Sequence, residues 1–151
     1  MLRALASGIA GALVLNVVHE SARRVIPHAP RMDVIGTRAI RRPIVAAGMR
    51  PPPWNRLHKA ALAGDLVANS AYYSLVGLGD PETARHRGLL LGLAAGVGGA
   101  LLPPLIGLGN QPHRKTPYTQ LLTVAWYTIG GVVAGEVAQR LTSRRLLSRR
   151  W

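Results

Sequence analysis

The chain has 151 residues, a net charge of +13 and 48% hydrophobic residues, so it has the length of a single domain. Cysteine is absent, which excludes disulfides, thiolate metal sites and a cysteine nucleophile. Nearly all of the 19 Lys and Arg lie between or outside four long apolar stretches, whereas a soluble amphipathic helix carries charge every third or fourth position. This distribution indicates membrane spans flanked by cations that meet anionic headgroups, so we expect no nucleic-acid partner.

The first apolar stretch predicts a membrane-spanning helix over residues 2–24. A cleaved signal peptide is the alternative, which is disfavoured because no small-x-small cleavage site follows the apolar run. Pro27 and Pro30 end this helix. The Arg-rich connection up to residue 59 then contains either a short helix over residues 34–42, capped by Asp33 and lying at the headgroups, or an ordinary basic loop.

Three further apolar stretches predict spans over residues 56–79, 81–106 and 117–140, and a basic tail follows over residues 141–151. Each stretch is close to the roughly 20 residues that cross a hydrocarbon layer of about 30 Å. Continuous apolar runs without period-two alternation indicate helices rather than strands. The sequence therefore predicts an all-α polytopic membrane protein, a bundle of about four transmembrane helices with an Arg-rich first loop.

Capping signals mark the starts of the last two predicted spans. Asp80 and Thr116 each precede a proline, and an N-cap residue followed by proline at the first helical position is typical of a helix start. The pair Pro103-Pro104 is expected to break or kink the third span. Glu136 lies four residues before Arg140, a spacing that predicts an ion pair along the fourth helix.

Every predicted span also carries two small residues spaced four apart. Lipid supplies no hydrophobic drive for helix association, so close approach of backbones across small residues provides the packing. The pattern predicts a compact bundle, and small faces left over, notably on the third span, make self-association a further hypothesis. The predicted packing residues are Ser7, Gly11, Ala60, Gly64, Gly92, Gly96, Gly131 and Gly135.

Orientation stays open at this level. With four full crossings, one side carries 8 Lys and Arg and the other 11, which is a weak positive-inside signal. If the third span instead turned back at Gly98-Gly99, the counts would be 14 against 5. Insertion in both orientations is a third alternative. Our preference is an N-terminus outside, with Arg23 and Arg24 in the cytoplasm.

Two polar stripes are the candidate functional site. The first ends the first helix with spacing i, i+3, i+4, i+7, and the second lies on the second helix; both lie toward the same membrane face because the first loop joins them. An acid inside an apolar span needs a partner, so we expect His19, Arg23 or Arg24 to pair with Asp65. The cluster consists of Asn16, His19, Glu20, Arg23, Arg24, Asp65, Asn69 and Tyr72.

Two interpretations of this cluster compete. It is a pocket for a proton, ion or lipid headgroup, in which Glu20 or Asp65 titrates and Arg23 or Arg24 binds phosphate, or it is a set of packing contacts between two helices. A helix-borne zinc site is disfavoured because the position four after His19 is an arginine. We therefore predict no metal and no cofactor.

The function with the best support from sequence is non-catalytic: an accessory or scaffold protein that packs with other membrane subunits or with itself and binds anionic lipid. The Arg-rich, Phe-free composition indicates a bacterial protein, hence the cytoplasmic (inner) membrane. One alternative is a small proton- or ion-coupled transporter or channel using Glu20 and Asp65. Another is a lipid-modifying enzyme with His19 as general base, so enzymatic activity is left uncertain and is the less favoured outcome.

Overall fold

The computed structural model describes residues 1–110 and 117–147, with side chains described as far as Thr142. All regular elements in this part of the chain are helical, as the sequence predicts. They are α1 (Leu2–Val25), α2 (Met32–Ala46), α3 (Trp54–Ser74), the short 3-10 helix η1 (Leu75–Gly77), α4 (Ala84–Leu105) and α5 (Pro117–Leu147).

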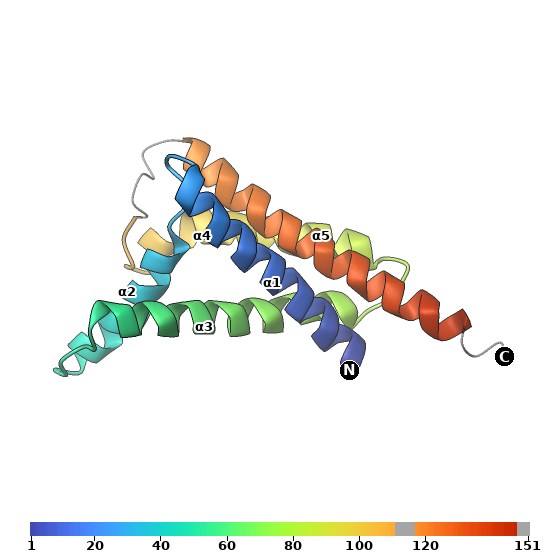
Figure 1. Ribbon diagram of the computed structural model, residues 1–151, viewed down its shortest axis with the longest axis horizontal. Helices are drawn as coiled ribbons and strands as arrows, with labels where there is room; N and C mark the ends of the chain where they lie inside the picture. Colours follow the sequence, from blue (N-terminus) through green and yellow to red (C-terminus); the bar gives the residue numbers. More distant parts are fainter. Residues whose placement is uncertain (111–116, 148–151) are drawn as a thin grey trace.

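Four of the helices form an antiparallel bundle, and α2 lies across one of its ends (Figure 1). Helix α5 packs between α4 and α1, and α1 packs between α5 and α3. We call the end that carries α2, the last turn of α1 and the first turns of α3 the α2 end. The opposite end, which holds the N-terminus, η1 and the start of α4, is the η1 end.

Three helices of the described chain are long and apolar enough to cross a membrane: Leu2–Val25, Ala84–Leu105 and Pro117–Thr142. Their outward faces expose large apolar side chains; on α1 these are Leu5, Ile9, Leu13 and Val17. An apolar surface of this extent is that of an integral membrane protein. Helix α3 is long enough, but it carries too many polar residues to meet the same criterion, so the predicted count of four spans is not confirmed.

Small residues allow α4 and α5 to approach backbone to backbone. A Cβ atom on Gly92 would lie 2.8 Å from the Tyr127 carbonyl oxygen, and one on Gly96 would lie 2.6 Å from the Val124 Cα. Gly131 and Gly135 of α5 lie as closely against Gly88 and Ala84, at the start of α4. These contacts leave no room for a methyl group.

The contact between α1 and its neighbours uses the predicted small residues as well. Ser7 is fully buried, and a Cβ on Gly11 would lie 2.6 Å from the Gly130 carbonyl oxygen on α5. The packing role predicted for Gly64 is wrong. It is exposed, as is the predicted packing residue Ala60, and a Cβ added to Gly64 would meet nothing within 4 Å, because α3 turns Ala61 toward Gly36 of α2 and points Gly64 away from the bundle.

Several predicted boundaries shift. Helix α4 begins at Ala84 rather than at residue 81, because the Asp80 carboxylate accepts the N–H of Glu82 in a tight turn before the helix. It then continues through Pro103 and Pro104 to Leu105. The helix is also continuous at Gly98-Gly99, so the alternative in which the third span turns back there is wrong. The predicted cap Thr116 lies outside the described residues.

Candidate functional site

The two predicted polar stripes meet at the α2 end, where α2 joins them. Asn16, His19, Glu20 and Arg23 of α1 and Asp65 of α3 line one small cavity, together with Asp33 and Met32 of α2. Its volume is about 20 Å³. A single water needs about 10–15 Å³ measured in this way, so the cavity has room for about one water or a small ion and no room for a lipid headgroup.

Asp33 is the centre of the charged part of this site. Its side chain is 6% exposed, and its two carboxylate oxygens accept hydrogen bonds of 2.8 Å from Nε and Nη2 of Arg31. Nη1 of Arg23 and Nδ1 of His58 each lie 3.8 Å from Oδ2 of Asp33. One carboxylate thus contacts side chains from the end of α1, the start of α2 and the start of α3.

Sequence reasoning assigned Asp33 to capping and missed this role. In the structure Asp33 lies in the first turn of α2, whose N-cap is Arg31, and α2 extends beyond the predicted end to Ala46. The signal in the sequence was that Asp33 is the only acid in the Arg-rich connection, which makes it the natural partner for several cations. His58 carried no such signal.

The electrostatics of Asp33 favour the charged form. Burial alone would raise the pKa of the Asp33 carboxyl, but the hydrogen bonds from Arg31 and the charges of Arg31 and Arg23 outweigh it and hold that pKa below its ordinary value. In return, the Asp33 carboxylate raises the pKa of the Arg31 guanidinium. The pair is therefore ionised at neutral pH.

Glu20 is paired along its own helix. Oε2 of Glu20 lies 2.6 Å from Nη2 of Arg23 and 3.9 Å from Nη2 of Arg24, whose side chain is 72% exposed. Arg23 therefore bridges two acids, Glu20 and Asp33, whereas Arg24 lies at the rim of the site. We refer to Glu20, Arg23, Arg31, Asp33 and His58 as the Asp33 cluster.

Asp65 has different partners from those expected. Its carboxyl interacts with the side-chain amides of Asn16 and Asn69, and in the described chain no Arg, Lys or His forms an ion pair with it. The expectation of a pair with His19, Arg23 or Arg24 is wrong, because the ion pairs of Arg23 and Arg24 are with Glu20 and Asp33. Asn69 is 8% exposed, so this amide–carboxyl contact lies within the bundle.

His19 packs against aromatic side chains rather than against an acid. Its ring lies edge-on to Trp126 at 5.1 Å and to Tyr127 at 5.6 Å, measured between ring centroids. Both aromatic residues are buried on α5. His19 also lines the small cavity, which has no room for a lipid substrate.

Tyr72 does not belong to the site. Its hydroxyl donates a hydrogen bond of 2.9 Å to the Leu91 carbonyl oxygen on α4. The adjacent Tyr73, fully buried, donates one of 2.7 Å to the Tyr127 carbonyl oxygen on α5. These two hydrogen bonds connect α3 to α4 and to α5.

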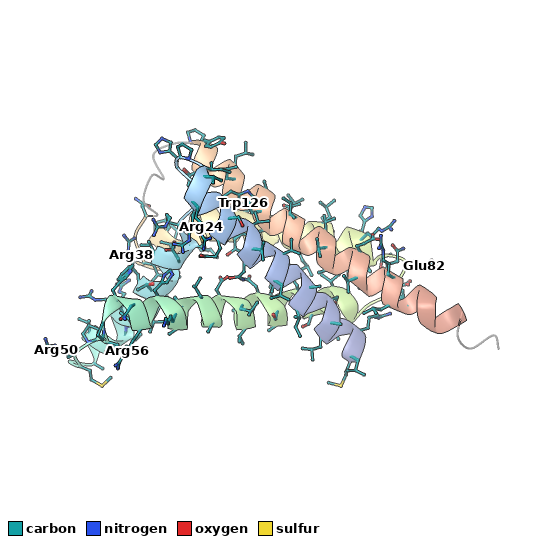
Figure 2. All side chains as sticks on the ribbon, in the orientation of Figure 1. Arg24, Arg38, Arg50, Arg56, Glu82 and Trp126 are labelled. Carbon is teal, nitrogen blue, oxygen red and sulfur yellow. The ribbon has the colours of Figure 1, made fainter. Side chains whose placement is uncertain are left out.

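Arg38, Arg50 and Arg56 lie at the α2 end of the bundle (Figure 2), and the basic side chains at the two ends differ in what they contact. At the η1 end, Arg3 and Arg87 donate to backbone carbonyl oxygens of η1 and its neighbours, and Arg85 and Arg140 pair with Glu136 at 2.7 and 2.6 Å. The predicted pair of Glu136 with Arg140 is confirmed.

At the α2 end, four basic side chains have neither an ion pair nor a side-chain hydrogen bond within the described chain: Arg41, Arg50, Arg56 and Lys59. All four are exposed.

The site combines ion pairs around Asp33, amide contacts to Asp65 and a cavity of about 20 Å³. Within residues 1–110 and 117–142, no group of three or more His, Cys, Asp or Glu could hold a metal ion. Comparisons with protein-family models, with curated proteins and with solved structures found no match.

Proposed function

We propose that this protein is a non-catalytic membrane scaffold that crosses the bilayer four times and binds anionic lipid at its α2 end. The main observation in support of the proposal is that side-chain contacts hold α2 across that end. The Asp33 cluster joins α2 to α1 and α3, while the guanidinium groups of Arg38 and Arg42 donate to carbonyl oxygens of the segment that follows α4. An Arg-rich helix held in this way supplies fixed positive charge at headgroup depth.

The fourth crossing is α3. Support for this part of the proposal is that α3 runs from the α2 end to the η1 end, in the opposite direction to α1, and packs against α1. Its polar residues lie in the first turns, at Arg56 and Lys59, or face the bundle, at Asp65 and Asn69. Its outward face is uncharged, with exposed residues Ala60, Ala63, Gly64, Val67, Ala68 and Ala71.

The exposed cations provide the attraction to lipid. Each Lys or Arg near an anionic leaflet contributes about 1 kcal/mol, so the four without partners give about 4 kcal/mol as an upper figure. In this proposal the α2 end faces the cytoplasm of a bacterial cell, as the preferred orientation from sequence has it. Exposed apolar faces on α1, α3 and α4 are the surfaces on which other membrane subunits, or a second copy, would pack.

Native mass spectrometry of the detergent-purified protein tests the proposal. With phosphatidylglycerol and phosphatidylcholine of the same acyl chains added in equal amounts, we expect several-fold more phosphatidylglycerol to remain bound. Purification from membranes in mild detergent tests for partner subunits in the same preparation. Equal retention of the two lipids, together with a chain that purifies alone as a monomer, would count against the scaffold.

Proton-coupled transport is the second candidate, and the Asp65 environment is what favours it. Asp65 and Glu20 both line the cavity, and Asp65 has amide partners instead of a cation. Proteoliposomes loaded with a pH-sensitive dye measure proton flux directly. If flux occurs and survives the combined change Asp65→Asn and Glu20→Gln, these acids do not carry it.

A further inference from the structure

A groove on the far side of α2 from the Asp33 cluster brings three arginines together. Arg38, Arg41 and Arg42 have the spacing i, i+3, i+4 and share one face of α2, opposite the turn that ends α4 at Gly107 and Leu108. The groove has a volume of about 450 Å³. That volume is within the range of about 300–1,000 Å³ typical of small-molecule sites.

The end of α4 shapes the groove. Gly107 has a φ of +77°, and the N–H groups of Gly107 and Leu108 donate to the carbonyl oxygens of Pro104 and Pro103. This is the Schellman ending of a helix, in which the residue at positive φ is most often glycine. A Cβ on Gly107 would collide with the Arg42 guanidinium, so a side chain at this position would displace that group.

Two of the arginines are held in place with donors left over. Nη1 of Arg38 donates to the carbonyl oxygens of Asn110 and Leu108 at 2.7 and 3.3 Å, and Nη1 of Arg42 donates to Ile106 at 3.2 Å. In the described chain, Nε and Nη2 of Arg38 and Arg42 make no hydrogen bond, and Arg41 makes none at all.

A guanidinium presents five N–H groups in a planar fork that matches the oxygens of a phosphate. No residue lining the groove is acidic. Three guanidiniums, two of them oriented by the end of α4, therefore favour an anion over a neutral ligand. Together they offer more donors than the two oxygens of one carboxylate can accept from, and a phosphate group supplies additional oxygens.

The surroundings of the groove select a lipid phosphate. Leu105 and Ile106 at the end of α4 are 78% and 62% exposed, and Val45 on the groove wall is 46% exposed. The groove also lies at the end of a helix long and apolar enough to span the membrane, which is headgroup depth. We propose that this groove binds the phosphate headgroup of one anionic phospholipid, with its acyl chains against Leu105 and Ile106.

This inference rests on the proposed lipid binding and gives it a single location. The test uses the full chain in detergent with one probe, phosphatidylglycerol titrated in native mass spectrometry. The groove variant is Arg41→Gln with Arg42→Gln, and the matched control is Arg85→Gln with Arg140→Gln, which removes the same charge at the η1 end, away from the proposed lipid-binding end. Both control arginines are exposed, with side chains 62% and 75% accessible, and both pair with Glu136.

We expect the tightest phosphatidylglycerol site to weaken by about tenfold or more in the groove variant, since each lost charged hydrogen bond costs about a factor of ten. The control variant should change by less than about twofold, and a large excess of inorganic phosphate should displace little lipid, because it makes no apolar contact. Arg41→Gln alone, which breaks no bond within the described chain, should weaken the site in the same direction.

Different failures have different meanings. If the unmodified protein does not distinguish phosphatidylglycerol from phosphatidylcholine, the proposed lipid binding fails and this site fails with it. If it does distinguish them but groove and control variants weaken binding equally, the binding is diffuse and only the groove is overturned. If inorganic phosphate displaces the lipid completely, the ligand is free phosphate and the lipid assignment is overturned.

Discussion

Replacing Asp33 with asparagine removes the charge that holds α2 against α1 and α3 and leaves the size of the side chain almost unchanged. Removal of one partner from a fully buried ion pair costs about 3–5 kcal/mol, whereas an exposed pair contributes about 0–1 kcal/mol. Asp33 is 6% exposed, but its partners on α1 and α3, Arg23 and His58, are 26% and 22% exposed, so water screens part of the interaction. We therefore expect the free energy that keeps α2 docked to fall by about 2 kcal/mol.

Amide hydrogen exchange in nanodiscs measures this opening segment by segment. Since 1.4 kcal/mol is a factor of ten, the α2 amides should exchange about thirtyfold faster in Asp33→Asn, while those of α4 and α5 keep their rates. Asp80→Asn is the matched control, because Asp80 is an exposed acid at the η1 end and an asparagine there can still accept the Glu82 N–H. Unchanged α2 exchange in Asp33→Asn, or equal acceleration in every helix, would refute the reasoning.

Three further outcomes follow from the packing and the charges. Gly92→Ala should lower the thermal stability by the equivalent of about 1–3 kcal/mol, because its methyl group would lie 2.8 Å from α5 backbone atoms. Gly64→Ala, at an exposed position within α3 where alanine favours the helix, should leave the melting temperature unchanged or raise it; equal losses in the two variants would contradict the packing. Tyr73→Phe should cost about 1 kcal/mol in the same melting assay by removing the bond to the Tyr127 carbonyl oxygen, and no change would show that the bond adds nothing. The folded-state pKa of Asp33 is lowered, so its contribution to stability is complete above its unfolded pKa of about 4 and is lost as the pH falls through the folded value. The difference in melting temperature between the unmodified protein and Asp33→Asn should therefore stay constant from about pH 7 to 5 and disappear below about pH 4. A difference that grows below about pH 4 would contradict the lowered pKa.

The helices themselves were predictable because their causes are local. Apolar runs of about 20 residues, with prolines and charges between them, mark where helices lie whatever they pack against, and the predicted spans 2–24 and 117–140 fall within α1 and α5. The ends of α4 were less predictable. Whether Asp80 starts a helix or a turn, and whether Pro103 stops one, depends on the neighbours that hold each end.

The candidate site was predictable in part, since side-chain spacing on one helix is also local. The spacing of Asn16, His19, Glu20 and Arg23 places them on one stripe, and all four line the same cavity. Tyr72 has the spacing of the Asp65 stripe yet donates to α4, because a stripe that extends over two turns of a tilted helix meets a different neighbour at each end. A shared position on the stripe therefore did not determine which helix a side chain contacts.

Sequence by itself determined that this chain is a set of apolar helices with cationic connections, because hydrophobicity and charge act on each segment separately. Only the tertiary structure decided that Asp33 joins three helices, that Asp65 contacts amides rather than cations, and that Gly64 faces outward. These outcomes depend on how each helix is rotated about its axis and on where α2 returns to the bundle. Both are set by packing between segments far apart in the chain, where no local pattern carries the information.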